Sequence, residues 1–337
     1  MDGVSPGRLD EILESAAGVR VLVVGDLMLD RYISGPVDRV SPEAPVPVVR
    51  VATTTAAVGG AGNVAANVAA LGATCRVVAC LGADPAGEVV VAELSQLGVH
   101  TDGLVRTDER PTTEKTRVLA LRQQIVRFDV EDDRDVSVGL ARSLSEKVEQ
   151  LAAESDVLVM QDYNKGVLTP AVISSVVEAG ARLGLPTVVD PKRRNFSSYG
   201  SVTVFKPNAK ELGDALGDFI HADDADWMEA TRRTLGCQNL LLTLGEQGMA
   251  LQTAEGTSVR IPTAARGVYD VSGAGDTVTG VVAVVLAAGG TPTEAAILGN
   301  HAAAIEVGKA GVATVSPDEL RAHVAHHGAT SSHLPTH

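Results

Sequence analysis

The clearest pattern in the chain is a repeated alternation of short apolar runs with longer segments of helical period. The runs are rich in Val and Leu and hold few polar positions, which is typical of strands buried on both faces of a parallel sheet. They lie at Val21–Val24, Val77–Leu81, Val157–Met160, Thr187–Val189, Val202–Phe205 and Leu240–Leu244. The helical segments lie at Ala61–Leu71, Gly87–Leu97, Val138–Ala153, Pro170–Leu183, Ala225–Leu235, Gly275–Ala288 and Thr293–Val307. This order predicts a doubly wound α/β sandwich.

Two stretches, at about 31–58 and 112–130, break this alternation. Both hold β-branched and alternating residues, as in Val46–Val51 and Thr116–Leu121. Neither is followed by a helix at the distance that a parallel crossover requires. They therefore predict antiparallel strands outside the main sheet, which we interpret as a small β-lid inserted into the core domain.

The core domain with its lid would span residues 1–328, and the polar residues 329–337 would form a disordered tail. Five of the eight histidines lie in the last fifteen residues. Their irregular spacing favours a solvated tail over a metal site.

Composition and charge exclude several classes of partner. Aromatic residues make up 3% of the chain, and 28 Lys and Arg stand against 42 Asp and Glu, for a formal net charge of −14. So few rings disfavour base stacking, and the charge would repel a nucleic acid or an anionic bilayer surface. The three cysteines show no paired spacing, which fits a reducing compartment. The sequence shows no signal peptide and no apolar run long enough to span a bilayer. We expect a cytoplasmic protein.

The most informative segment is Asp270-Val-Ser-Gly-Ala-Gly-Asp276-Thr277, which precedes an apolar helix. Its small residues, Gly273, Ala274 and Gly275, let backbone N–H groups converge at the first helical turn, where the helix dipole also favours an anion. Asp276 would repel a bound phosphate, so we interpret it as a base that takes a proton from an alcohol while the N–H groups hold the transferring group. A glycine-rich helix start with Asp276 supporting the dipole is the structural alternative.

A second glycine-rich segment, at residues 59–67, is open to two interpretations. Gly60-x-Gly62-x-x-Ala65 satisfies the loose dinucleotide fingerprint, with Asp84 as a ribose-binding acid, and suggests a nicotinamide-dependent oxidoreductase. That fingerprint should follow the first core strand, whereas here it follows a lid strand. Asn63, on a loop whose glycines admit close approach, suits a polyol better than a pyrophosphate.

Two further segments could face a nucleotide, although the chain has no P-loop string. Asn208 and Glu211 follow a predicted strand, and they suit a helix-capping pair and a water-mediated Mg²⁺ site equally well. Thr243, Gly245 and Gly248 belong to a strand–turn–strand segment whose hydroxyl and bare backbone could approach a nucleotide. By itself that segment reads as an ordinary turn.

With these four segments in order, the chain resembles the ribokinase-like (PfkB) carbohydrate kinases over roughly 19–318. The resemblance implies a three-layer α/β/α sandwich with a β-lid, and transfer of the γ-phosphoryl group of ATP to a sugar hydroxyl with Mg²⁺. It implies Asp276 as catalytic base and Gly273, Ala274 and Gly275 as the anion hole. The implied sugar contacts are Asp30, Gly59, Gly60, Asn63 and Asp162. The implied ATP and metal contacts are Asn208, Glu211, Thr243, Gly245, Gly248 and Asn300. Asp270 and Ser272 match positions where many relatives hold a monovalent cation such as K⁺.

Three other segments, Val24–Tyr32, Val40–Val48 and Gln161–Gly166, resemble the D-glycero-β-D-manno-heptose 7-phosphate kinases. That resemblance implies phosphorylation of the anomeric C1 hydroxyl to the 1,7-bisphosphate, on the route to ADP-heptose and the lipopolysaccharide core. The family's kinase is often fused to a nucleotidyltransferase, and this chain has no His-x-Gly-His string, so we expect a separate protein to add the nucleotide. A kinase for another sugar, sugar phosphate or nucleoside stays open.

A phosphorylated substrate needs a cation away from its reacting hydroxyl. The candidates are Lys115, Arg117, Lys165, Lys192, Arg193 and Arg194. Lys165 stands out because it follows a buried strand, at the sheet edge where α/β ligands collect. Exposed lid strands commonly pair across subunits, so we also expect a homodimer through the lid.

Overall fold

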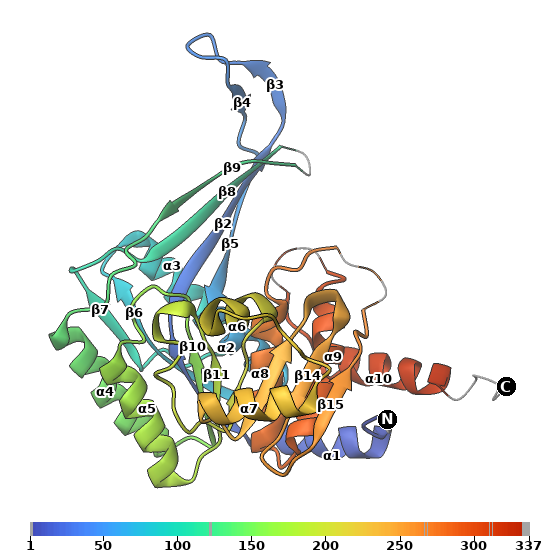
Figure 1. Cartoon of the computed structure of the whole chain (residues 1–337). Helices are drawn as coiled ribbons and strands as arrows, with labels where there is room; N and C mark the ends of the chain where they lie inside the picture. The colour runs from blue at the N-terminus through green and yellow to red at the C-terminus, as the bar shows by residue number, and fades with distance from the viewer. Residues whose placement is uncertain are drawn as a thin grey trace.

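A nine-stranded sheet forms the centre of the computed structural model (Figure 1). The structure describes residues 3–331 apart from positions 121, 122, 266, 268, 310 and 312, and for 328–331 it describes the backbone alone. In order across the sheet the strands are β15 (Ser258–Ile261), β14 (Met249–Gln252), β13 (Asn239–Thr243), β12 (Val204–Phe205), β11 (Thr187–Asp190), β10 (Val157–Gln161), β1 (Arg20–Gly25), β6 (Thr74–Gly82) and β7 (Leu104–Thr107). Neighbouring strands are parallel except at β14, which runs antiparallel to β13 and β15. The mainly parallel sheet is confirmed.

Helices cover both faces of this sheet. One layer holds α1 (Pro6–Ala16), α2 (Ala61–Ala70), α3 (Pro85–Gln96), α8 (Ala274–Ala287), α9 (Pro292–Glu306) and α10 (Pro317–Ser331). The other holds α4 (Val138–Ala152), α5 (Pro170–Leu183), α6 (Ala209–Leu216) and α7 (Ala225–Leu235). Successive residues of β1 alternate between the layers: Val21 and Val23 join one cluster, and Leu22 and Val24 join the other. Strands apolar at every position are therefore buried on both faces, as predicted.

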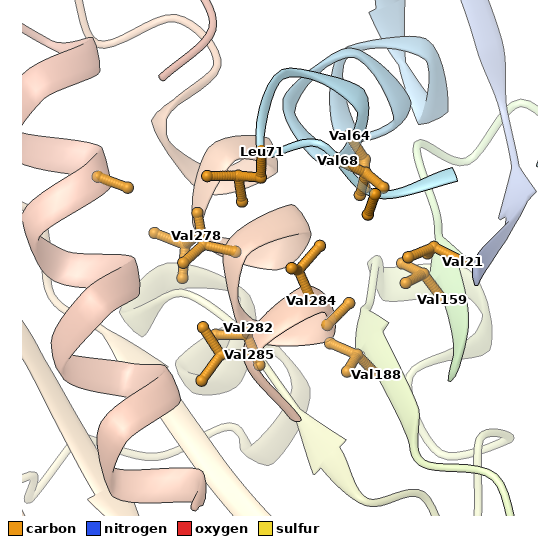
Figure 2. Close-up of a cluster of buried hydrophobic side chains, with 14 of the residues drawn as sticks. Val21, Val64, Val68, Leu71, Val159, Val188, Val278, Val282, Val284 and Val285 are labelled. Atoms are coloured by element: carbon orange, nitrogen blue, oxygen red, sulfur yellow. The ribbon is translucent and has the colours of Figure 1, made fainter. Parts of the chain in front are cut away.

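Helix α8 lies at the centre of its layer. Figure 2 shows its valines beside residues of α2 and of three core strands: Val278, Val282, Val284, Val285, Val64, Val68, Leu71, Val21, Val159 and Val188. β-branched residues are weak helix formers, by a few tenths of a kcal/mol each. Full burial of such a side chain contributes about 1.5–3 kcal/mol and outweighs that cost. Packing thus holds the start of α8 against the sheet.

The lid is a separate four-stranded sheet in the order β5-β2-β8-β9. Its strands are β2 (Leu27–Gly35), β5 (Thr53–Gly60), β8 (Thr113–Ala120) and β9 (Gln123–Val130). Figure 1 shows it rising from the core, with the hairpin of β3 (Val37–Val40) and β4 (Pro47–Val49) at its far end. The prediction of antiparallel strands is wrong for β2 and β8, which pair in parallel. In each of the two lid segments the first strand, β2 or β8, leads away from the core and the second, β5 or β9, returns to it. The two first strands therefore run in the same direction.

Element boundaries differ from the sequence prediction in a few places. Helices α1, α6 and α10 were not predicted, and α6 buries only Leu212. Helix α10 continues to Ser331, three residues into the segment expected to be a disordered tail, and positions 332–337 lie outside the described residues. Within the described ranges, no helix combines the length and apolar character needed to cross a membrane.

Candidate active site

The predicted anion hole lies at the first turn of α8. Gly273 is the N-cap at φ 100°, a conformation that L side chains rarely adopt. The first backbone bond of the helix runs from the Thr277 N–H to the Gly273 carbonyl. The N–H groups of the three residues between them therefore point out of the helix end, where they can meet an anion. A Cβ on Gly275 would lie 3.7 Å from Lys206 Nζ, which places this turn beside charged groups of the sheet edge.

Asp276 is 4% exposed and is held by three side chains, one from α2 and two from the end of β10 and the loop after it. Asn63 Nδ2 donates to its Oδ2 over 2.9 Å, and Gln161 Nε2 and the Tyr163 hydroxyl donate to its Oδ1 over 3.0 and 2.8 Å. Burial, and then the charge of Asp190, raise the pKa of Asp276 to about 6, against the opposing effect of its donors. A carboxylate with a pKa near neutrality suits a general base.

A second buried carboxylate, Asp190, ends β11 beside Asp276. Gln161 Nε2 lies 3.0 Å from Asp190 Oδ2 and so bridges the two acids. Lys206 Nζ lies 3.0 Å from the same oxygen, and Lys192 Nζ 3.8 Å from Oδ1. Burial alone would raise the pKa of Asp190, but the two ammonium groups hold it below its ordinary value. The two environments thus shift the two pKa values in opposite directions, and Asp276 is the one of the pair whose pKa suits a general base.

One face of the lid presents polar groups to this site. In the strand register Asp30 pairs with Lys115, and Tyr32 with Arg117, so all four side chains share a face. The Arg117 guanidinium forms an ion pair with Asp30 and lies 5.3 Å from the Tyr32 ring centroid. Asp30, a predicted sugar contact, and Arg117, a candidate cation for the substrate phosphate, are thus brought together.

Two glycines at the base of the lid are required by close packing. A Cβ on Gly59 would lie 2.3 Å from Asp30 Oδ2. Gly60 has φ 60°, and a Cβ there would lie 2.4 Å from the Asp26 carbonyl oxygen. Their contact with a sugar stays a prediction, while their packing role is a feature of the fold.

Asp162 and Asn63, two of the predicted sugar contacts, are held by hydrogen bonds within the protein. The Asp162 carboxylate is buried and accepts from the Tyr199 hydroxyl over 2.6 Å and from the Asn164 N–H over 2.7 Å. It therefore shapes the loop after β10, and its contact with a sugar stays a prediction. Asn63 is also buried and its amide donates to Asp276, so its contact with a polyol likewise stays a prediction.

Lys165, the favoured phosphate-binding cation, is already paired. Its Nζ lies 2.8 Å from Glu131 Oε2. Its backbone N–H donates to Asp26 Oδ2 over 3.0 Å. The Glu131 carboxylate therefore neutralises the charge that a substrate phosphate would need.

Part of the predicted nucleotide-binding set lies at the neighbouring strand ends. Asn208, which follows β12, forms a parallel bridge with Thr243, the last residue of β13. Gly245, in the 3₁₀ turn η2 (Gly245–Gln247), has φ 59° and open space around its Cα. Gly248 instead packs against β15, where a Cβ would lie 2.1 Å from the Ile261 carbonyl oxygen, and Asn300 Nδ2 donates to the Pro262 carbonyl over 2.8 Å. The structure thus brings three of these residues together.

Asn208 and Glu211 form a capping box at the start of α6, which confirms the helix-capping interpretation of this pair. The Glu211 N–H donates to Asn208 Oδ1 over 2.8 Å, and the Asn208 N–H donates to Glu211 Oε2 over 2.9 Å. Lys192 forms an ion pair with the other carboxylate oxygen, Oε1. Both Glu211 oxygens already have partners, which favours contact with Mg²⁺ through water, as proteins commonly hold that ion. The residues fit a hydrated Mg²⁺.

Asp270 and Ser272 lie beside the end of α9. The Ser272 N–H donates to Asp270 Oδ1 over 2.9 Å, and the Asp270 N–H donates to the Val307 carbonyl over 3.2 Å. Next to them Glu306 is 0% exposed, and among the described residues neither carboxylate oxygen has a hydrogen bond of normal geometry. Burial, followed by the charges of Asp270 and Asp276, raises the pKa of Glu306 to about 8. An orphaned buried carboxylate at this place fits a bound cation.

Several residues of the site were not assigned from the sequence. They are Asp26, Gln161, Tyr163, Asp190, Lys206 and Glu306. Asp26 accepts the N–H groups of Tyr163, Lys165 and Val167 over 2.8, 3.0 and 3.1 Å, and so shapes the loop that carries Tyr163. The sequence held a signal that could have found most of them, since they lie at the carboxyl ends of the predicted parallel strands. Ligands of α/β sheets gather at these ends.

Comparison with known proteins gives the family of this chain. The family model of the pfkB family carbohydrate kinases matches residues 19–319. The chain belongs to the PfkB family of carbohydrate kinases. It is 45% identical over 322 residues to the bifunctional protein HldE of Citrifermentans bemidjiense, covering 95% of this chain and 66% of that protein. It is 43% identical over 311 residues to HldE of Caulobacter vibrioides, covering 91% and 63%. This PfkB kinase therefore spans about two thirds of the length of these relatives.

Solved structures confirm the ribokinase-like fold of this PfkB kinase. Ribokinase from Arabidopsis thaliana, complexed with ribose and ATP, superposes with a TM-score of 0.71 at 21% identity and covers 91% of this chain and 99% of its own. Phosphofructokinase-2 from Escherichia coli, in complex with potassium, gives a TM-score of 0.74 at 21% identity, with 92% and 98% covered. The oxidoreductase hypothesis is wrong, because β5, which leads into α2, lies in the lid.

Proposed function

We propose that this PfkB kinase transfers the γ-phosphoryl group of ATP to the anomeric hydroxyl of D-glycero-β-D-manno-heptose 7-phosphate. The observation that carries the transfer step is the buried Asp276, with its raised pKa, at a helix start whose N–H groups point outward. The choice of heptose rests on the resemblance of three sequence segments and on the cations near the site. The addition of a nucleotide by a separate protein and the cytoplasmic location stay predictions from the sequence.

The chemistry follows from the position of Asp276. Its carboxylate accepts the proton of the sugar hydroxyl as the hydroxyl oxygen bonds to the γ-phosphorus. The bond from that phosphorus to the bridging oxygen breaks, and ADP leaves with the electron pair. The outward N–H groups at Ala274–Asp276 stabilise the charge on the phosphoryl group in transit. Asn63, Gln161 and Tyr163 keep the carboxylate in position.

Two cations fit this site. Mg²⁺ supplies charge neutralisation on the ATP phosphates, and Asn208 and Glu211 would hold its waters. Asp270, Ser272 and Glu306 would hold a monovalent cation such as K⁺ behind the anion hole, where it would offset the buried charge of Glu306.

Lys115 supports a substrate that already carries a phosphate. Its Nζ lies 5.9 Å from the centroid of the Tyr163 ring, whose hydroxyl contacts Asp276. Lys115 forms no ion pair with any described residue, whereas Lys165 and Lys192 are paired with Glu131 and Glu211. Burial lowers the pKa of Lys115, and a phosphate would restore its preference for the charged form. We therefore assign the substrate's phosphate to Lys115.

The test is ADP release measured with heptose 7-phosphate, unphosphorylated heptose, fructose 6-phosphate, ribose and adenosine. We expect the highest kcat/KM with heptose 7-phosphate. Lys115→Met should lower that value by about 10- to 100-fold, the loss of one charge-assisted contact, and change it little for unphosphorylated heptose. Lys210→Met, at an exposed lysine of α6, is the matched control. A clear preference for another substrate would contradict the heptose assignment, and near-normal turnover by Asp276→Asn would contradict the base.

The outer face of the lid supports a homodimer. Val126, Phe128 and Val130 lie on this face and are about half exposed. They alternate along β9 with Arg127 and Asp129, which share the inner face with Lys115 and Arg117. A second copy offers an identical apolar face, so twofold pairing of two lids would cover both.

A further inference from the structure

Helix α10 packs against α9 on the outside of the core (Figure 1). Three histidines meet between these two helices. His301 belongs to α9, and His323 and His327 belong to α10. One potential ligand atom from each ring lies within 4.8 Å of the others. The Nδ1 atoms of His301 and His323 are 3.0 Å apart. The cluster thus joins two helices that a long loop separates in the sequence.

Helical spacing accounts for part of this geometry. His323 and His327 are four residues apart, so their side chains lie one above the other on the same face of α10. That face is turned to α9, where His301 meets it. His326 is exposed and lies outside the three-ligand group. The expectation of a solvated histidine tail therefore does not hold for His323 and His327.

Hydrogen bonding prepares one ring to bind a metal. His327 Nδ1 lies 3.0 Å from the His323 carbonyl oxygen. A neutral ring donates its Nδ1–H to that carbonyl, which leaves the lone pair of Nε2 directed away from the helix. Metal-binding histidines are commonly oriented in this way, by a carbonyl that accepts from the second ring nitrogen.

We propose that His301, His323 and His327 form a binding site for a divalent transition metal ion of the zinc class. Imidazole ligands suit Zn²⁺, Co²⁺, Ni²⁺ and Cu²⁺, whereas Mg²⁺ prefers oxygen. In a tetrahedral zinc site, Zn–N distances of about 2.0–2.1 Å separate the ligand atoms by roughly 3.3 Å. The three rings approach this spacing already, so small side-chain rotations complete the set. All three are half-buried, which leaves the fourth position for water.

An ion at this place would tie the last described helix to the core. Its ligands come from two helices, so the folded chain presents them together and the unfolded chain does not. Binding is therefore expected to stabilise the folded state. The site is independent of the kinase assignment, because none of its ligands belongs to the candidate active site.

The test uses the full chain without a polyhistidine tag, stripped of metal with a chelator and titrated with Zn²⁺ by calorimetry. Excess Mg²⁺ is present, because it occupies the oxygen ligands of the active site and competes little for imidazole nitrogens. We expect one zinc ion per chain and a rise in the Tm of thermal unfolding. Co²⁺ should give the visible absorption of a tetrahedral nitrogen site.

Replacing any one of the three histidines should weaken zinc binding by at least about tenfold and remove the rise in Tm. The variants are His301→Ala, His323→Ala and His327→Ala. His326→Ala, at the adjacent exposed position, and His221→Ala, which packs on Trp227 in the other layer, should bind as the unsubstituted chain does. Circular dichroism checks that each variant is folded. Absence of saturable binding up to about 0.1 mM zinc, or binding that the three substitutions leave unchanged, would overturn the proposal.

Discussion

The hydroxyl of Tyr163 donates to Oδ1 of Asp276 over 2.8 Å, from the loop after β10 to the first turn of α8. Burial, and then the charge of Asp276, keep the pKa of Tyr163 well above its ordinary value, so the phenol stays a donor. This bond favours the charged form of Asp276, whereas burial favours the neutral form. The pKa of the proposed base is the balance of the two effects.

The first prediction concerns the acid limb of the pH profile. Because Asp276 must be ionised to accept a proton, kcat/KM should rise as the pH passes through about 6. Tyr163→Phe removes a donor that lowers this pKa, so the limb should move to higher pH. Rates measured from acid to mildly alkaline pH for both proteins check this.

Tyr199→Phe is the matched control, because Tyr199 donates to Asp162 and not to Asp276. It should leave the limb in place. A limb that stays fixed or moves to lower pH in Tyr163→Phe would show that the phenol does not set the pKa of the base.

The second prediction concerns the buried pair of Lys206 and Asp190. Lys206→Met leaves the Asp190 charge in the interior, where Lys192 offsets it only in part. Loss of one partner of a buried pair costs about 3–5 kcal/mol, and we expect this decrease in the free energy of unfolding. Urea unfolding measures it.

The exposed pair of Lys210 and Asp214 supplies the control, since Lys210→Met should cost less than about 1 kcal/mol. The double variant Asp190→Asn/Lys206→Met should lose less than the sum of its single variants. Strict additivity would mean that the two groups do not interact.

The third prediction concerns Gly59. A methyl group there would lie 2.3 Å from Asp30 Oδ2, so Gly59→Ala must displace the carboxylate that Arg117 holds. Displacement of a positioning group can cost on the order of 100-fold in rate, and we expect a 10- to 100-fold lower kcat/KM for the sugar. The KM for ATP should change little, because the atoms that the added methyl group would meet belong to Asp30 and Met28 of the lid.

Steady-state kinetics with each substrate varied in turn measure both values. Gly139→Ala, on the exposed first turn of α4, should leave the kinetics unchanged. An equal effect on both substrates would point to a general loss of structure.

The fourth prediction concerns the outer face of the lid. Phe128 is 51% exposed there, and Phe128→Glu would place two like charges against each other in a twofold pairing. Light scattering after size exclusion should show a dimer for the unsubstituted chain and a monomer for this variant. Val138→Glu changes an 89% exposed valine outside the lid and should stay dimeric. A monomer before substitution would contradict the dimer proposal.

Local pattern was enough to predict most of the architecture. The bounds of α5 and α7 agree with the sequence prediction, because periodicity and N-cap residues mark where those helices begin. The two lid stretches were also located, since alternation without a crossover helix is visible within a short window. The anion hole and Asp276 were assigned from one continuous segment, whose chemistry lies within a single turn.

Only the tertiary structure decided what surrounds Asp276. Its three donors lie 213, 115 and 113 residues away in the chain, and they meet because β10, α2 and α8 share one edge of the fold. Tertiary structure also decided which lysine is available to a substrate phosphate. Lys165 is paired with Glu131, whereas the lid places Lys115 over the Tyr163 ring. Periodicity and motif spacing record which residues are buried and which share a helix or strand. Which distant partners they meet depends on strand order and packing, and these set the charge and pKa of the site.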